Sequence, residues 1–145
     1  MYKDTVTLFN RKQGAEGDTW YPAVLEGVNL NKDKGAIFRR YGPNSTDNAV
    51  LNVRYEGTGE DITVNGKTWL QPKEWARLNE PSGAITFAPG DFFWAGTWEG
   101  NTPLYDGTYG DLSFYDYMLN NYDDVFLITS VGFFSVIPHM EVTAR

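Results

Sequence analysis

The sequence predicts a mainly antiparallel β-protein, a barrel or a sandwich, with one or two short α-helices. Three observations lead to this fold class: short runs alternate polar and apolar residues, turn-forming residues separate them, and few segments carry helix signals. The chain has 145 residues, a length that one hydrophobic core can serve, and it contains neither a linker nor an internal repeat. We therefore expect a single β-rich domain spanning residues 1–145.

The first two strands are expected to form a hairpin. Residues 5–10 alternate polar and apolar side chains, and residues 20–28 repeat this pattern. Between them, residues 14–18 are rich in turn formers. The N-terminal segment is therefore predicted to be built into the sheet.

Two further strands are expected around a polar segment. Residues 35–41 and 49–55 both have the composition of a strand. Residues 42–48 between them have almost no apolar content. This segment should form an exposed loop.

A tight hairpin is expected in the middle of the chain. Residues 61–64 and 67–70 flank Asn65 and Gly66. An Asn-Gly pair suits a two-residue type I′ turn, because both central positions of that turn need positive φ. This pair is the clearest local turn signal in the sequence.

A short helix and two more strands are expected next. Pro72 suits the first turn of a helix over residues 73–78, where its missing N–H group costs nothing, and Pro81 should end the helix. Residues 84–87 return to a strand pattern, and a Pro-Gly turn leads into residues 91–94.

A second helix is expected from about Leu112 to Asn121, with Asp111 as its N-cap. It lies in an expected helix-bearing insertion over about residues 96–124. Its apolar residues fall into two stripes. The helix is thus either mostly buried, or it packs one stripe on the sheet and offers the other to a neighbouring molecule. The first stripe comprises Leu112, Tyr115, Leu119 and Tyr122, and the second Phe114, Tyr117 and Met118.

Two closing strands are predicted near the C-terminus. Residues 125–131 are strongly apolar and β-branched, and a second strand pattern runs over residues 135–142 after Gly132. The second pattern reaches almost to the end of the chain. We therefore expect the last element to belong to the sheet instead of forming a loose tail.

Composition argues against several classes of function. The net charge is −7, and the 12 Lys and Arg residues are scattered singly, so no basic stripe is available for direct, sequence-specific nucleic-acid binding. The absence of Cys excludes disulfides, thiol catalysis and thiolate metal sites. No run approaches the roughly 20 apolar residues of a membrane span, and Met1–Asp4 leads directly into a strand pattern. We expect a soluble protein that is not exported.

Catalytic signals are scarce. His139 is the only histidine, so multi-histidine metal sites cannot form within one chain, and we interpret it as a packed or rim residue. P-loop, Gly-x-Ser-x-Gly, Gly-x-Gly-x-x-Gly and His-Glu-x-x-His patterns are all absent. The sequence therefore predicts a protein that is not an enzyme, with no catalytic residues, no cofactor and no dedicated metal site.

Acidic residues cluster around the second helix. They lack the one-three-five spacing and the closing Glu of a calcium loop. Solvation and helix capping explain them more simply, and whether they bind a metal stays open. The cluster comprises Asp106, Asp111, Asp116, Asp123 and Asp124.

Aromatic residues are abundant, with five Trp, nine Tyr and nine Phe. Several crowd a glycine-rich stretch, which is either a loop pinned to the core by its rings or a surface that orders against a partner. Three successive rings at residues 92–94 cannot all face one side of a strand, so at least one needs a cover other than this domain's own core. The candidate partner contacts are Phe92, Phe93, Trp94, Trp98, Tyr105 and Tyr109.

The order of these elements resembles the head-tail joining proteins of tailed bacteriophages and prophages, the minor capsid or head closure-like proteins. Three pieces carry the resemblance: residues 4–10 followed by Trp20 and residues 24–28, the hairpin of residues 65–70, and the ending of residues 126–131 with residues 138–142. The segment at residues 71–75 and the insertion depart from compact members of that group. In these features the chain is more similar to a longer uncharacterised family of Gram-positive bacteria and their phages.

The resemblance implies a structural, non-enzymatic role in a virion, in the head-tail connector region. It implies a small β-barrel-like core, contacts with the portal, an adaptor or a tail component, and a homo-oligomeric ring on assembly. Localisation would be the virion, and the bacterial host cytoplasm before assembly. No membrane partner is expected.

Two other functions stay open from the residues alone. A carbohydrate-binding module would need two or three of Trp20, Trp69, Trp94 and Trp98 coplanar and exposed on one face. A small glycoside hydrolase would need two carboxylates facing each other across a cleft, one of them with a raised pKa.

Overall fold

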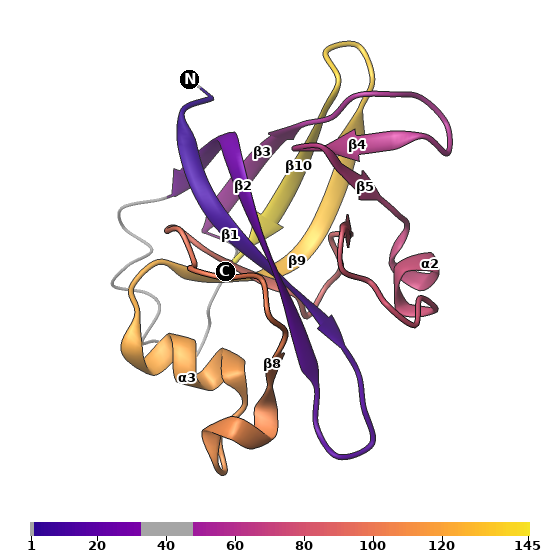
Figure 1. The fold of residues 1–145 in the computed structure, drawn as a ribbon. Coiled ribbons are helices and arrows are strands. Elements are labelled where there is room, and N and C mark those ends of the chain that lie inside the picture. The colour runs from indigo at the N-terminus through magenta and orange to yellow at the C-terminus, as the bar shows by residue number, and fades with distance from the viewer. Residues whose placement is uncertain (1, 33–47) are drawn as a thin grey trace.

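An antiparallel β-barrel of six strands forms the centre of the computed structural model, which describes residues 2–32 and 48–145 (Figure 1). The sheet runs in the order β1-β7-β9-β10-β3-β2, and pairing of β1 with β2 closes it. This confirms the predicted mainly β fold and selects a barrel over a sandwich. The strands are β1 (Asp4–Lys12), β2 (Thr19–Lys32), β3 (Ala49–Arg54), β7 (Phe92–Trp94), β9 (Val125–Phe134) and β10 (His139–Ala144).

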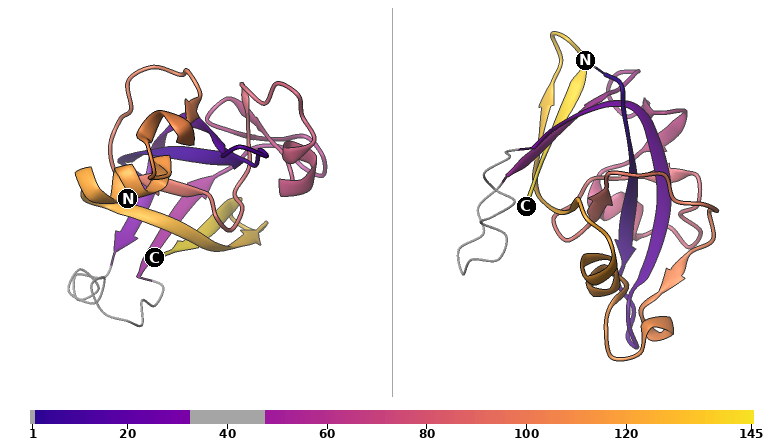
Figure 2. Two further views of the ribbon diagram at one scale, coloured as in Figure 1. Left: turned by 90° about the horizontal axis from the view of Figure 1, so that it is seen from below. Right: turned by 90° about the vertical axis from the view of Figure 1, so that its left-hand side faces the viewer.

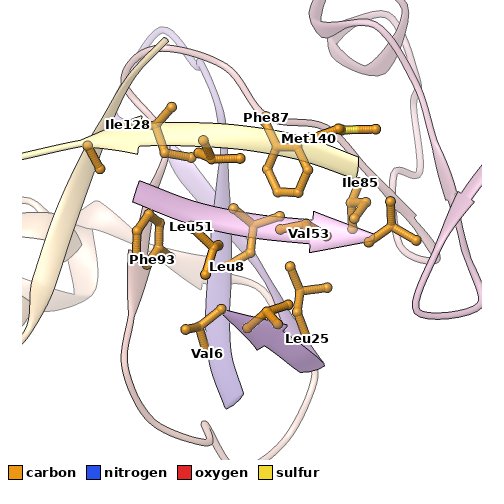
Figure 3. Close-up of a cluster of buried hydrophobic side chains, with 14 of the residues drawn as sticks. Val6, Leu8, Leu25, Leu51, Val53, Ile85, Phe87, Phe93, Ile128 and Met140 are labelled. Carbon is orange, nitrogen blue, oxygen red and sulfur yellow. The ribbon is translucent and has the colours of Figure 1, made fainter. Parts of the chain in front are cut away.

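The barrel interior is filled by aliphatic and aromatic side chains that alternate along the strands. Val6 and Leu8 of β1 point inward with Leu51 and Val53 of β3 and Met140 of β10, and all five are fully buried (Figure 3). Period-2 alternation places every second residue of a strand on the same face of the sheet. Burying each such side chain stabilises the fold by about 1.5–3 kcal/mol.

A small three-stranded sheet and a short helix lie beside the barrel. β4 (Ile62–Val64) pairs antiparallel with β5 (Lys67–Trp69), which pairs parallel with β6 (Ala84–Ile85). The turn between β4 and β5 has φ of 53° at Asn65 and 76° at Gly66, which confirms the predicted hairpin. The helix α2 (Pro72–Ala76) begins at the predicted proline and ends before Pro81.

The segment of about residues 96–124, which we predicted to be an insertion and continue to call the insertion, covers the outside of the barrel near β1 and β7. It contains β8 (Leu104–Tyr105), which pairs with β2, the 3₁₀-helix η1 (Asp106–Tyr109) and α3 (Phe114–Asn121). Both views of Figure 2 show α3 lying against the barrel strands. A second hydrophobic core forms here from buried side chains of β1, β2, β7, α3 and β9, namely Phe9, Trp20, Phe92, Phe114, Met118 and Val125.

Asp106 fixes the insertion to the opening hairpin. Its carboxylate accepts hydrogen bonds from Trp20 Nε1 at 2.7 Å, from the backbone N–H of Phe114 at 2.9 Å and from that of Asp18 at 3.0 Å. Charge-assisted bonds of this kind are stronger than neutral ones. One carboxylate thus holds β2, η1 and the start of α3 together.

The second helix differs in detail from its prediction. Its N-cap is Ser113, whose hydroxyl oxygen accepts a hydrogen bond from the backbone N–H of Asp116 at 3.1 Å. The prediction of Asp111 as the N-cap was therefore wrong. Leu112 and Leu119 are exposed, while Phe114 and Met118 are fully buried. The packed face is therefore the one built on Phe114 and Met118, since Phe114 must reach the rings that line the outside of β1 and β7.

The C-terminal hairpin confirms that the last strand belongs to the sheet. β9 extends through Phe134, and the turn lies at residues 135–138 instead of at Gly132. The predicted strand over residues 135–142 therefore begins later, at His139. The prediction of a strand at residues 35–41 and nearly all of the predicted loop at 42–48 lie outside the described residues.

Candidate partner-contact site

The β9–β10 hairpin carries the most exposed apolar side chains of the described residues. It extends beyond the end of the barrel at the top of Figure 1 and of the right-hand view in Figure 2. Val136 is 96% exposed and Ile137 73%, while Phe133 and Phe134 at the end of β9 are 43% and 44% exposed. We call these four residues the hairpin patch.

Aromatic neighbours hold the base of the hairpin patch. The Phe133 ring packs edge-on against Trp69, with 4.9 Å between centroids, and against Tyr55, at 5.6 Å. The Phe134 ring stacks on His139 at 4.9 Å, with 11° between the ring planes. Tyr55 Oη also donates to the carbonyl oxygen of Phe134 at 3.3 Å. The patch is thus presented from a supported strand pair, and His139 is confirmed as a packed residue.

Neighbouring apolar side chains that face water are unusual on a chain with this charge. Soluble proteins expose isolated apolar residues freely, but a contiguous group points to a surface that another molecule covers. Here Val136 and Ile137 lie at one projecting turn, and Phe133 and Phe134 lie beside it at the end of β9, on opposite faces of that strand. An arrangement of this kind offers an anchor for a partner, since aromatic and aliphatic anchors dominate the energetics of protein interfaces.

The six residues selected from the sequence fall mostly elsewhere. Phe93 is fully buried inside the barrel, and Phe92 is fully buried in the second core. Trp94, Trp98 and Tyr109 pack against that second core and are partly buried. The ring that needed a cover beyond the barrel therefore finds it in this chain's own insertion.

Tyr105 is the one member of that predicted set with a largely exposed ring, at 58%. Partner contact through it stays a prediction. The sequence did not single out the hairpin patch, because Val136 and Ile137 fall within the strand predicted over residues 135–142, and Phe133 and Phe134 fall within the turn predicted after Gly132. The usable signal was the placement of Ser135 and Pro138 on either side of two β-branched residues, since Ser and Pro are turn formers.

A second notable site is the buried carboxylate of Asp91, at the entry to β7. Asp91 Oδ1 accepts from the backbone N–H of Arg11 at 2.9 Å, and Oδ2 accepts from Asn10 Nδ2 at 2.9 Å and from the backbone N–H of Ala88 at 3.2 Å. Burial raises the pKa of Asp91 to about 6, although these hydrogen bonds oppose the rise. Asn10 also donates to the carbonyl oxygen of Thr86 at 2.7 Å.

This carboxylate has the raised pKa expected of a general acid, but its surroundings differ from those of a hydrolase. The adjoining groove of about 440 Å³ is lined by Arg11, Lys12 and Lys73, and Asp91 is its only carboxylate among the described residues. Glycoside hydrolysis by the usual route needs a second carboxyl group across the cleft. The network instead joins β1 to the turn before β7.

The tryptophans form no flat platform. Trp20, Trp69 and Trp75 are buried, and the half-buried Trp94 and Trp98 stand at 85° to each other. Sugar stacking as set out above needs coplanar exposed rings. In this structure the indoles serve packing.

The acidic residues near α3 are spread over separate structural roles. Asp106 accepts three hydrogen bonds, Asp116 lies in the first turn of α3, and Asp124 pairs with Lys32 at 2.9 Å. Within residues 2–32 and 48–145, no three His, Cys, Asp or Glu side chains converge as metal ligands. No helix in this part of the chain is long and apolar enough to cross a membrane.

Fold and site together define a closed β-barrel protein with an exposed apolar hairpin. The model of a family described as "Family of unknown function (DUF6751)" matches residues 1–145, and the chain belongs to this family. No curated protein and no solved structure matches the chain.

Proposed function

We propose that this chain is a structural, non-enzymatic component of a tailed bacteriophage or prophage virion, positioned in the head-tail connector region. The observation that carries the proposal is the hairpin patch, where Val136 and Ile137 are 96% and 73% exposed on a supported strand pair. Such a surface suits burial against another protein. The choice of a virion rests on the resemblance of the sequence to head-tail joining proteins.

Binding a partner through the hairpin patch does not require a catalytic group in the barrel. Asp91 is committed to three hydrogen-bond donors, and its groove is lined by cations without a second carboxylate among the described residues. These observations favour a structural role over hydrolysis. The partners are the portal, an adaptor or a tail component, and assembly would take place in the host cytoplasm before the protein enters the virion.

The test starts from the double variant Val136→Ser/Ile137→Ser. It removes the two most exposed apolar side chains of the hairpin without touching the barrel interior. The matched control is Leu112→Ser/Leu119→Ser, which removes two side chains of 44% and 45% exposure near and on α3. Each chain is co-expressed with the products of its neighbouring genes, and complexes are measured by size-exclusion chromatography with light scattering.

We expect the native chain and the α3 control to form a stoichiometric complex with one neighbouring gene product, and the hairpin variant to remain free. Quantitative mass spectrometry of purified particles should find the native chain at a fixed copy number. Absence of the chain from particles would overturn the virion proposal. Equal complex formation by both variants would overturn the role of the hairpin patch.

A further inference from the structure

A groove opens at the base of the hairpin patch and shares Phe133 with it. Its volume is about 420 Å³, and its walls include Ile62 of β4, Trp69 of β5 and the half-exposed ring of Phe133. Ligand sites of this size range are lined mainly by apolar side chains and a few polar groups. Groove and patch thus form one continuous surface.

The charge of this groove has one sign. Glu60 and Glu74 both line it, and its lining contains neither Lys nor Arg among the described residues. Both glutamates are exposed, and in the described part of the chain neither has a cation within 4 Å. Two carboxylates without a counter-charge in a groove with an apolar wall favour the binding of cationic groups.

Trp69 adds a polar group without a partner. Its side chain is 4% exposed, and its Nε1–H group finds no acceptor within the described residues. Buried indole N–H groups usually have one, and leaving such a donor unpaired costs about 1–3 kcal/mol. A small movement of the ring would offer this donor to the backbone carbonyl of a bound segment.

We infer that the groove binds an extended segment of a partner protein in which Lys or Arg alternates with apolar residues. The cationic side chains would pair with Glu60 and Glu74, the apolar ones would cover Phe133, and a backbone carbonyl would accept from Trp69 Nε1. An extended chain suits this arrangement because its alternate side chains point to opposite faces. The inference rests on the proposed contact role and names the chemistry of the partner.

The probe is a fluorescein-labelled nine-residue peptide that alternates leucine with lysine, titrated into the full chain and followed by fluorescence anisotropy. The test variant is Glu60→Gln/Glu74→Gln. The matched control, Glu16→Gln/Glu99→Gln, changes the net charge equally at two exposed sites outside the groove. We expect the test variant to bind about two- to thirtyfold more weakly than the control, since two exposed ion pairs together contribute about 0.4–2 kcal/mol.

Nuclear magnetic resonance locates the contact. The indole N–H signal of Trp69, assigned by its loss in Trp69→Phe, should shift when the peptide is added. Equal binding of a peptide with glutamate in place of lysine, equal loss in both glutamine variants, or an unmoved Trp69 signal would each overturn the inference. The composition of purified particles tests the virion role separately. If the native chain is found in particles and the Glu60→Gln/Glu74→Gln variant is incorporated equally well, only the role of the groove is refuted.

Discussion

The packing of the insertion against the barrel rests on Phe114. Its side chain is fully buried, and the centroid of its ring lies 5.1 to 6.4 Å from the centroids of six other rings. Three of those rings lie on the strands β1, β2 and β7, so the space left by Phe114→Ala should close only in part. The surrounding rings are Phe9, Trp20, Phe92, Trp98, Tyr109 and Tyr117.

Phe114→Ala should lower the free energy of unfolding by about 3–5 kcal/mol, the usual cost of truncating a buried Phe to Ala. Domains have about 5–15 kcal/mol of stability, so a loss of this size is a large fraction of the total, and the variant should unfold at a lower urea concentration. Leu119→Ala on the same helix is the control, since Leu119 is 45% exposed and its truncation should cost less than about 1 kcal/mol.

Urea titration followed by far-ultraviolet circular dichroism and by tryptophan fluorescence measures both variants. The fluorescence change should coincide with the loss of β structure, because Trp20 and Trp98 both contact Phe114. A cost below about 1 kcal/mol for Phe114→Ala, equal to that of Leu119→Ala, would refute the reasoning. It would mean that the insertion contributes no packing to the barrel in solution.

Three further predictions follow from other contacts. Asp91 should titrate near pH 6 in nuclear magnetic resonance, and titration below pH 4 would contradict this. Because its pKa lies above the usual 3.8, its contribution to the free energy of unfolding should fall as pH rises from about 4 to about 6. Asp106→Ala should cost about 2–3 kcal/mol in urea unfolding by removing the acceptor of three N–H groups, and an unchanged midpoint would count against that role. Gly66→Ala should cost about 1 kcal/mol through its φ of 76° alone, as a Cβ there meets nothing within 4 Å; a loss above 3 kcal/mol would point to a clash instead.

Local signals in the sequence were sufficient for most elements. The Asn65-Gly66 turn, the start of α2 at Pro72 and the alternation in β1 and β2 depend on the backbone preferences of a few neighbouring residues. The same alternation predicted a mainly β fold. Closure into a barrel could not be read from the sequence, because it needs β1 to pair with β7 as well as with its hairpin partner β2, and the β1–β7 pairing joins residues far apart in the chain, such as Thr7 and Trp94.

The sequence by itself determined that more rings exist than one core needs and that consecutive rings at residues 92–94 must face opposite sides. Only the tertiary structure decided what covers them: Phe93 enters the barrel, while Phe92 lies beneath α3. The most exposed apolar residues in the described part of the chain are instead Val136 and Ile137, at a turn whose position the strand pattern could not locate. The physical reason is that burial depends on the contacts of the whole folded chain. A short run of apolar residues has the same sequence pattern whether it lies inside a sheet or beyond its end.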